Sequence, residues 1–268
     1  MLKIVATPDA LRRLSDRWRR EGRTIGFVPT MGALHEGHAS LIRRAAEECG
    51  RVVVSIFVNP KQFGPKEDFA RYPRTFAADK KLCAKAGAHA IYFPSAQAMY
   101  PPGFSTTVSV SGVTAPLEGA RRPGHFDGVA TVVAKLLIAA RPDRAYFGEK
   151  DFQQLAVVRR LAADLDLGCA IVGCRIVRER DGLAMSSRNR YLSPSERAAA
   201  PLIHRALALG PGKARAAMRK IPGAKLDYVE LVDADTFRKP TPKTKRRRLL
   251  AAVRLGATRL IDNTDISC

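Results

Sequence analysis

Long apolar runs are missing from this chain of 268 residues, although 46% of its residues are hydrophobic. No stretch approaches the roughly 18 uninterrupted apolar residues that a membrane-spanning helix needs. The first residues, MLKIVATPDALRRLSDRWRR, carry charges where a signal peptide would be apolar. We therefore expect a cytoplasmic protein that does not enter a membrane, with one sizeable α/β domain and a smaller second one.

Cysteine is also scarce, with five residues in all. The one close pair, Cys169 and Cys174, has the spacing C-x4-C without a nearby histidine, which does not match a structural zinc site. An odd number of cysteines also argues against a closed disulfide framework. We predict neither arrangement for Cys49, Cys83, Cys169, Cys174 and Cys268.

Acidic residues are few: 25 Asp and Glu stand against 46 Lys and Arg, a net charge of +21. Such a charge attracts nucleic acids, acidic membranes and phosphorylated substrates alike. Much of the excess is dispersed arginine, and the one dense run, Lys243–Arg248, is better explained as a solvated loop than as a nucleic-acid contact. Because helix-turn-helix, aromatic RNA-platform and zinc-finger patterns are absent, a nucleic-acid-binding module is the weaker alternative.

The first two thirds of the chain alternate apolar, strand-like runs with helical patterns. Buried strands separated by helical crossovers indicate an α/β fold with a Rossmann-like, doubly wound parallel sheet, which we assign to residues 1–177. The expected strands are 25–30, 51–59, 90–94, 106–110, 144–149 and 170–177. The expected helices are 38–49, 75–86, 128–140 and 152–165.

The pattern changes beyond Val177. A polar loop over 178–189 is followed by a helical pattern over 193–207 and by three short strand patterns at 226–233, 248–256 and 258–263. These elements predict a small α+β domain over residues 178–268, which we expect to act as a lid.

Two histidines follow the first expected strand, in GFVPTMGALHEGHASLI. The strand ends at Thr30, and a helix is expected to begin close to His38. Open α/β sheets bind ligands at the carboxyl ends of their strands, and a helix N-terminus attracts anions. His35 and His38 fall on one side of the first helical turn, so both imidazoles would face a phosphate. In a chain with only five histidines, an H-x-G-H pair at this place favours function over coincidence.

Three further segments carry polar side chains at strand ends or in loops. In FGEKDFQQ, Lys150 offers a charge to a phosphate, and Asp151 either caps the helix or joins a magnesium shell. In DGLAMSSRNRYL, Ser186–Arg188 offers donors to a triphosphate. In FVNPKQFGPKEDFARYPR, the neutral amides of Asn59 and Gln62 suit a substrate with hydroxyls and a carboxylate. Taken singly, the first segment also fits an ordinary Asp N-cap with a solvated lysine, and the second fits a serine-rich turn in which Arg188 pairs with an acidic side chain.

Together and in this order, the segments resemble the pantothenate synthetases, adenylate-forming nucleotidyltransferases related to class I aminoacyl-tRNA synthetases. The resemblance rests on PTMGALHEGH, FVNPKQFGPKEDFARYPRT, RPGHFDGVATVV, FGEKDFQQL and DGLAMSSRNRYLS. It implies a two-domain enzyme, usually a homodimer, that joins pantoate to β-alanine with ATP and Mg²⁺. It further implies a pantoyl-adenylate intermediate and the release of AMP and pyrophosphate.

The resemblance also implies residue roles. His38 would donate a proton, and it forms the expected catalytic set with His35, Lys150 and Arg188. The implied ATP contacts are Met31, Gly32, Ala33, Leu34, His35, Glu36, Gly37, His38, Gly148, Glu149, Lys150, Asp151, Val177, Met185, Ser186, Ser187 and Arg188. The implied pantoate and β-alanine contacts are Gln62, Gln154 and Asn59. No ligand of Mg²⁺ is assigned.

The main rival among enzymes is a nucleotidyltransferase that moves AMP or CMP onto a phosphate, because H-x-G-H occurs across the superfamily. The amides of Asn59 and Gln62 and the GEKDFQQ segment argue against it. One departure from the family concerns residues 205–225, which are shorter than usual. We expect this shortening to affect the lid and to leave the ATP and pantoate residues untouched.

Overall fold

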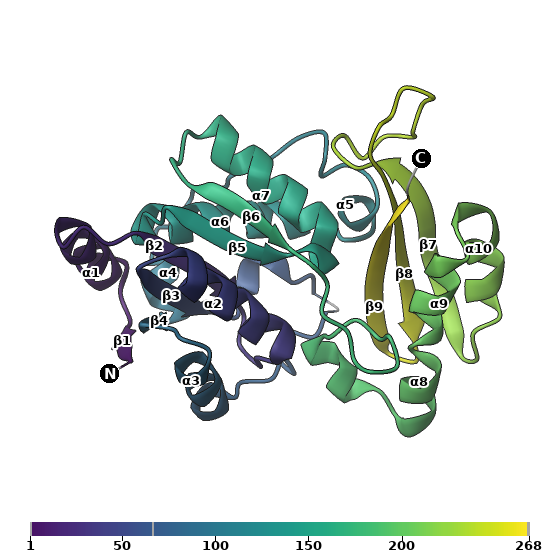
Figure 1. Ribbon diagram of the computed structural model, residues 1–268, viewed down its shortest axis with the longest axis horizontal. Coiled ribbons are helices and arrows are strands. Elements are labelled where there is room, and N and C mark those ends of the chain that lie inside the picture. Colours follow the sequence, from purple (N-terminus) through teal and green to yellow (C-terminus); the bar gives the residue numbers. More distant parts are fainter. Residues whose placement is uncertain (1, 66, 267–268) are drawn as a thin grey trace. The chain divides into compact units, whose positions relative to one another are not determined.

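The computed structural model describes residues 2–65 and 67–266, which form two compact units. Unit 1 comprises the described residues up to 149 together with 154–174, and unit 2 comprises 150–153 and the described residues from 175 onward. Figure 1 shows their elements along the chain. The short segment 150–153 thus groups with the C-terminal part of the chain. The predicted boundary after Val177 instead places this segment in the first domain.

Unit 1 is built on a parallel sheet, with six strands in the described residues and the order β1-β4-β3-β2-β5-β6. Its strands are β1 (Lys3–Val5), β2 (Ile25–Thr30), β3 (Arg51–Ile56), β4 (Ala90–Tyr92), β5 (Arg144–Gly148) and β6 (Ala170–Cys174). From β2 the chain proceeds outward through β3 and β4, and it later returns to β2 on the other side as β5. The loops after β2 and β5 therefore flank the topological switch point, where open sheets bind ligands.

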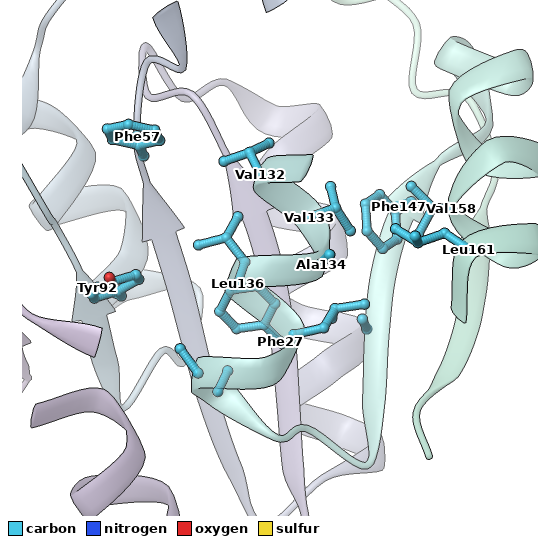
Figure 2. Close-up of a cluster of buried hydrophobic side chains, with 14 of the residues drawn as sticks. Phe27, Phe57, Tyr92, Val132, Val133, Ala134, Leu136, Phe147, Val158 and Leu161 are labelled. Atoms are coloured by element: carbon cyan, nitrogen blue, oxygen red, sulfur yellow. The ribbon is translucent and has the colours of Figure 1, made fainter. Parts of the chain in front are cut away.

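Helices cover both faces of this sheet (Figure 1). Successive strand residues point to opposite faces, so Phe27 packs with α1, α6 and α7, whereas its neighbour Val28 packs with α2 and α3. Figure 2 shows side chains of α6 directed at the strand of Phe27, and Phe147 directed at α7. The helices are α1 (Pro8–Arg20), α2 (Glu36–Glu48), α3 (Phe76–Lys85), α4 (Ala96–Met99), α5 (Glu118–Arg121), α6 (His125–Ala140) and α7 (Phe152–Asp164), with 3-10 turns η1 (Pro60–Gln62) and η2 (Glu149–Asp151).

Helix α6 is apolar on nearly all sides because it is buried on nearly all sides. Its glycine, Gly128, permits a close approach to η1: a Cβ atom there would lie 2.2 Å from the carbonyl oxygen of Lys61 and 2.7 Å from Cα of Gln62. Helix α6 therefore supports the backbone of the turn that carries Gln62.

Unit 2 contains an antiparallel sheet of order β7-β8-β9, formed by β7 (Ala224–Asp233), β8 (Arg247–Leu255) and β9 (Thr258–Ile266). Alternate residues of β8, from Leu249 to Leu255, pack against α9 and α10. The helices of this unit are α8 (Pro194–Ala199), α9 (Leu202–Ala208) and α10 (Pro211–Arg219), with the 3-10 turn η3 (Ser187–Tyr191). The predicted fold class, a doubly wound α/β sheet with a smaller α+β part, is confirmed.

Two expected elements are wrong in detail. Residues 106–110 form no strand; the segment is held instead by α6, where the Thr131 hydroxyl accepts the backbone N–H of Val108 over 2.9 Å. The single helix expected over 193–207 is two helices, because Pro201 has no N–H to continue α8 into α9.

Some elements were not predicted at all. Helix α1 has a regular amphipathic pattern that buries Leu11, Leu14 and Trp18, and Thr7 caps it by accepting the N–H of Ala10 over 3.2 Å. Its arginines lie on the exposed face of the helix. Strand β1 and helix α10 were missed as well, since each is short and has a weak apolar pattern.

The described cysteines, Cys49, Cys83, Cys169 and Cys174, are free thiols, and Cys268 lies outside the described residues. Burial raises the pKa of the Cys83 thiol to about 12, so it stays protonated at neutral pH. In the described ranges, none of the helices has the length and apolarity needed to cross a bilayer.

Candidate active site

The loop between β2 and α2 carries the paired histidines. Helix α2 begins at Glu36, two residues before the expected start, so His35 occupies the N-cap position with extended backbone (φ −137°, ψ 179°) and His38 lies in the first turn. The centroids of the two rings are 4.1 Å apart and their planes are inclined by 45°. Both imidazoles therefore lie at the positive end of the helix dipole, as predicted.

One hydrogen bond determines the tautomer of His38. The backbone N–H of His35 donates to Nδ1 of His38 over 3.3 Å. A neutral imidazole that accepts at Nδ1 carries its hydrogen on Nε2, so His38 has an N–H donor at its second nitrogen. A donor of this kind suits an oxygen that gains negative charge during phosphoryl transfer.

A buried carboxylate that the sequence does not reveal holds the same loop. Asp79, on α3, is 2% exposed and accepts the backbone N–H groups of Ala33 (3.0 Å) and Leu34 (2.8 Å). The Thr75 hydroxyl donates to it over 3.1 Å. Ala33 has a φ of +51° and Gly32 a φ of +85°, so the carboxylate stabilises a backbone conformation that L residues rarely adopt.

The substitution Asp79→Asn tests this support. Its NH2 group cannot accept a backbone N–H, and a buried polar group left unpaired costs about 1–3 kcal/mol. We expect the free energy of unfolding, measured in urea, to fall by about this amount, and the KM for ATP to rise. The control Asp9→Asn removes the same charge from a side chain that is 70% exposed and should change neither quantity. Equal effects of the two substitutions would contradict the role of Asp79.

The loop after β3 also reaches this site. Gln62 is 9% exposed, and its Nε2 lies 3.1 Å from Sδ of Met31, so the predicted substrate amide lies beside the H-x-G-H loop. Asn59 is 1% exposed and donates to Oε1 of Gln62 and to the carbonyl of Gly128, each over 3.0 Å. The structure therefore places Asn59 behind Gln62, as its support.

In unit 2, the end of the chain holds the backbone of the predicted catalytic lysine. The carbonyl of Lys150 accepts Nδ2–H of Asn263 over 2.9 Å, and Oδ1 of Asn263 accepts Nε–H of Arg248 over 2.7 Å. The ammonium group of Lys150 lies 3.5 Å from the carboxylate of Asp151. The segment 258–263, which the sequence predicts as a strand, thus contributes Asn263 to the positioning of Lys150.

The polar loop over 178–189, which carries Ser186–Arg188, belongs to the same unit. Arg178, at its start, binds Asp262 through two hydrogen bonds of 2.7 and 2.9 Å, a bidentate pair that fixes the loop against β9. At the loop's centre, Ser186 Oγ accepts the backbone N–H of Arg188 over 3.3 Å. Lys150 and Ser186 line one small hollow of unit 2, so two residues predicted to contact phosphate lie together.

A family model described as Pantoate-beta-alanine ligase matches residues 3–265. The chain belongs to this family. Among relatives of this ligase, the pantothenate synthetase of Heliobacterium modesticaldum is 56% identical, with 98% of each chain covered. The crystal structure of pantothenate synthetase from Thermus thermophilus has a TM-score of 0.94 at 45% identity and full coverage of both chains. That of pantoate-beta-alanine ligase from Francisella tularensis, complexed with Beta-gamma ATP and Beta-alanine, has a TM-score of 0.87 at 34% identity, covering 99% and 98%.

The family and the enzyme class expected from the motifs are confirmed: this member of the pantoate-β-alanine ligases is an ATP-dependent ligase. The predicted contact residues of the ligase divide between its units. Unit 1 holds Met31–His38, Asn59, Gln62, Gly148, Glu149 and Gln154. Unit 2 holds Lys150, Asp151, Val177 and Met185–Arg188. Their individual contacts with ATP and pantoate stay predictions.

Part of the basic run Lys243–Arg248 belongs to a strand of unit 2. Strand β8 begins at Arg247, and Arg248 is 4% exposed, with its guanidinium 4.2 Å from the ring centroid of Phe152. Arg246 forms an ion pair with Asp235 over 2.8 Å. The solvated loop expected over Lys243–Arg248 is therefore wrong for its last two residues, because these belong to a strand and Arg248 supports Asn263.

Proposed function

We propose that this ligase joins pantoate to β-alanine in two steps, with ATP as the energy source. In the first step, the pantoate carboxylate attacks the α-phosphorus of ATP, which gives pantoyl adenylate and releases pyrophosphate. In the second step, the amine of β-alanine attacks the acyl carbon, and AMP leaves as pantothenate forms. The observation that supports this most is the histidine pair at the N-terminus of α2, with the hydrogen of His38 on Nε2.

Each residue role follows from where charge develops. Attack on the α-phosphorus places negative charge on the transferring oxygens and on the departing pyrophosphate, which N–H donors and cations stabilise. We assign this task to His35, His38, Lys150 and Arg188. The neutral amides of Gln62 and Gln154 would bind pantoate. Catalysis is then mainly positioning and electrostatic stabilisation.

We infer that Mg²⁺ enters with ATP. Within the described residues, no group of three or more His, Cys, Asp or Glu side chains is arranged so that it could hold a metal ion. Mg²⁺ in nucleotide sites needs only one or two carboxylates in addition to phosphates and water, and Asp151, with a side chain 47% exposed, fits that requirement. When bound, the ion neutralises phosphate charge.

Isotope exchange tests the proposed reaction. Labelled pyrophosphate should exchange into ATP when pantoate is present and β-alanine is absent, because the first step is reversible and needs no amine. Omitting pantoate should abolish the exchange. Exchange that needs a phosphorylated acceptor in place of pantoate would favour the rival nucleotidyltransferase and sink the ligase mechanism.

We also propose that the ligase acts as a homodimer in the cytoplasm. The support for both proposals is the family of biosynthetic ligases to which the chain belongs. Light scattering coupled to size-exclusion chromatography should give twice the mass of one chain, and a monomer mass would refute the dimer.

A further inference from the structure

The buried amide of Asn59 has only one possible orientation. Its Nδ2 lies 3.0 Å from the carbonyl oxygen of Gly128, which can only accept. Its Oδ1 lies 3.3 Å from the backbone N–H of Lys61, which can only donate. Because neither backbone group can exchange its role, the oxygen and nitrogen of the Asn59 side chain are assigned without ambiguity.

This assignment determines the orientation of Gln62 as well. The atom of Gln62 that lies 3.0 Å from Nδ2 of Asn59 must be an acceptor, so it is Oε1. The other end of the Gln62 amide, Nε2, lies beside Met31 of the H-x-G-H loop. One of its hydrogens is donated to Sδ of Met31, and the second remains for a ligand, which suits a hydroxyl or carboxylate oxygen of a hydroxy acid.

One side chain outside the predicted site completes this arrangement. The hydroxyl of Tyr100 donates to Oδ1 of Asn59 over 2.7 Å, the shortest of the bonds to this amide. Its ring packs against Phe57 and Phe104, with centroids 6.2 and 5.1 Å away. Burial raises the pKa of the Tyr100 phenol, so the hydroxyl keeps its hydrogen and remains a donor.

The backbone of Gln62 has its own support. Nδ1 of His125 lies 2.9 Å from the Gln62 carbonyl, and Nε2 of His125 lies 3.0 Å from Nη1 of Arg122. Arg122 can only donate, so His125 carries its hydrogen on Nδ1 and donates it to Gln62. Burial, and next the charge of Arg122, lowers the pKa of His125 to about 4, which keeps the ring neutral at neutral pH. With the main chain of Gln62 held in this way, its side-chain amide is controlled from Asn59.

We propose that Tyr100 is a positioning residue that acts through Asn59 to direct the NH2 group of Gln62 toward the oxygens of the acid substrate. In this proposal Tyr100 acts through its hydrogen bond to Asn59 and not by binding the substrate. The inference rests on the proposed function, in which Gln62 binds pantoate. The inference adds a basis for specificity at that site, because only a ligand with a hydrogen-bond acceptor facing Nε2 of Gln62 binds well there.

The test measures pyrophosphate exchange with Tyr100→Phe, which deletes one hydroxyl and keeps the ring. Loss of a hydrogen bond of ordinary strength weakens binding by a factor of about five to ten. We expect the KM for pantoate to rise by that factor and the KM for ATP to stay within about twofold. The matched control is Tyr92→Phe, which removes another buried hydroxyl, one that donates to Sδ of Met99 over 3.3 Å, and should change neither KM.

A double-mutant cycle separates a positioning role from general loosening of the fold. If Tyr100 acts through Gln62, then adding Tyr100→Phe to Gln62→Ala should raise the KM for pantoate no further. A full additional rise in the double variant, an equal rise in both KM values, or an unchanged KM for pantoate in Tyr100→Phe would each overturn the inference. Absence of exchange in the unmodified enzyme would instead overturn the proposed function.

Asn59→Asp examines the next residue of the same arrangement. A carboxylate accepts only, so it attracts Nε2 of Gln62 and turns Oε1 toward the substrate. We expect the KM for pantoate to rise by about tenfold or more, above the effect of Tyr100→Phe. Circular dichroism should show a folded protein, and a folded Asn59→Asp variant with normal KM for pantoate would overturn the inference independently of Tyr100.

Discussion

Replacing His38 with alanine is expected to lower the rate of pantoate-dependent pyrophosphate exchange by about 10²-fold or more, as loss of a preorganised donor to developing charge typically does. The donor in question is Nε2–H, because the backbone N–H of His35 occupies Nδ1. The loss should fall mainly on kcat, since the charge that His38 meets is largest in the transition state.

Two near-isosteric substitutions identify which nitrogen of His38 matters. His38→Gln places an NH2 group close to the position of Nε2, whereas His38→Asn places a carbonyl oxygen close to Nδ1 and keeps the acceptor for His35. We expect His38→Gln to retain more activity than His38→Asn. The reverse order, in variants with normal circular dichroism, would assign the role of His38 to the loop structure and not to proton donation.

Replacing Lys150 with alanine should likewise lower exchange by about 10²-fold. The hydrogen bond between the Lys150 carbonyl and Asn263 involves the main chain, so truncating the side chain leaves this support in place. The expected loss therefore reports the missing ammonium group. Lys150→Arg should recover little, because a planar guanidinium does not replace a compact ammonium group.

Lys213→Ala is the matched control for this prediction. Lys213 is an exposed lysine of α10 in the same unit, and its removal lowers the net charge by the same amount. A nonspecific electrostatic effect on ATP binding would appear in both variants and would weaken as salt is added. We expect Lys213→Ala to match the unmodified enzyme, and a comparable loss in the two variants would refute a specific role for Lys150.

The sequence predicted those parts of the ligase that follow from local patterns. The continuous apolar runs of β2 and β3 indicated buried parallel strands, and the H-x-G-H pair identified the start of α2 to within two residues. Both signals lie within a short window of the chain. Two local patterns predicted the wrong structure. The helical pattern over 193–207 contains Pro201, at which the helix breaks, and the alternating segment 106–110 pairs with no strand.

The supporting residues could not be predicted in this way. Asp79 contacts a loop 46 positions earlier in the chain, Tyr100 contacts a residue 41 positions earlier, and Asn263 contacts one 113 positions earlier. None of these three residues forms part of a sequence motif. Each binds a backbone amide, a backbone carbonyl or a side chain that comes close only when the chain folds. The hydrogen bond from Asn59 to the Gly128 carbonyl, 69 positions later, is likewise formed only in the folded chain, and a contact between Asn59 and substrate stays a prediction.

The contact between α6 and η1 limits how the substrate specificity of this ligase can be altered by mutation. Any side chain at position 128 would meet backbone atoms of Lys61 and Gln62, and backbone yields far less readily than a flexible side chain. The position of the turn that carries Gln62 therefore depends on glycine at position 128. Selection or design for a differently shaped acid therefore has to change side chains such as Met31, whose Sδ lies 3.1 Å from Nε2 of Gln62, and cannot do so by substituting Gly128.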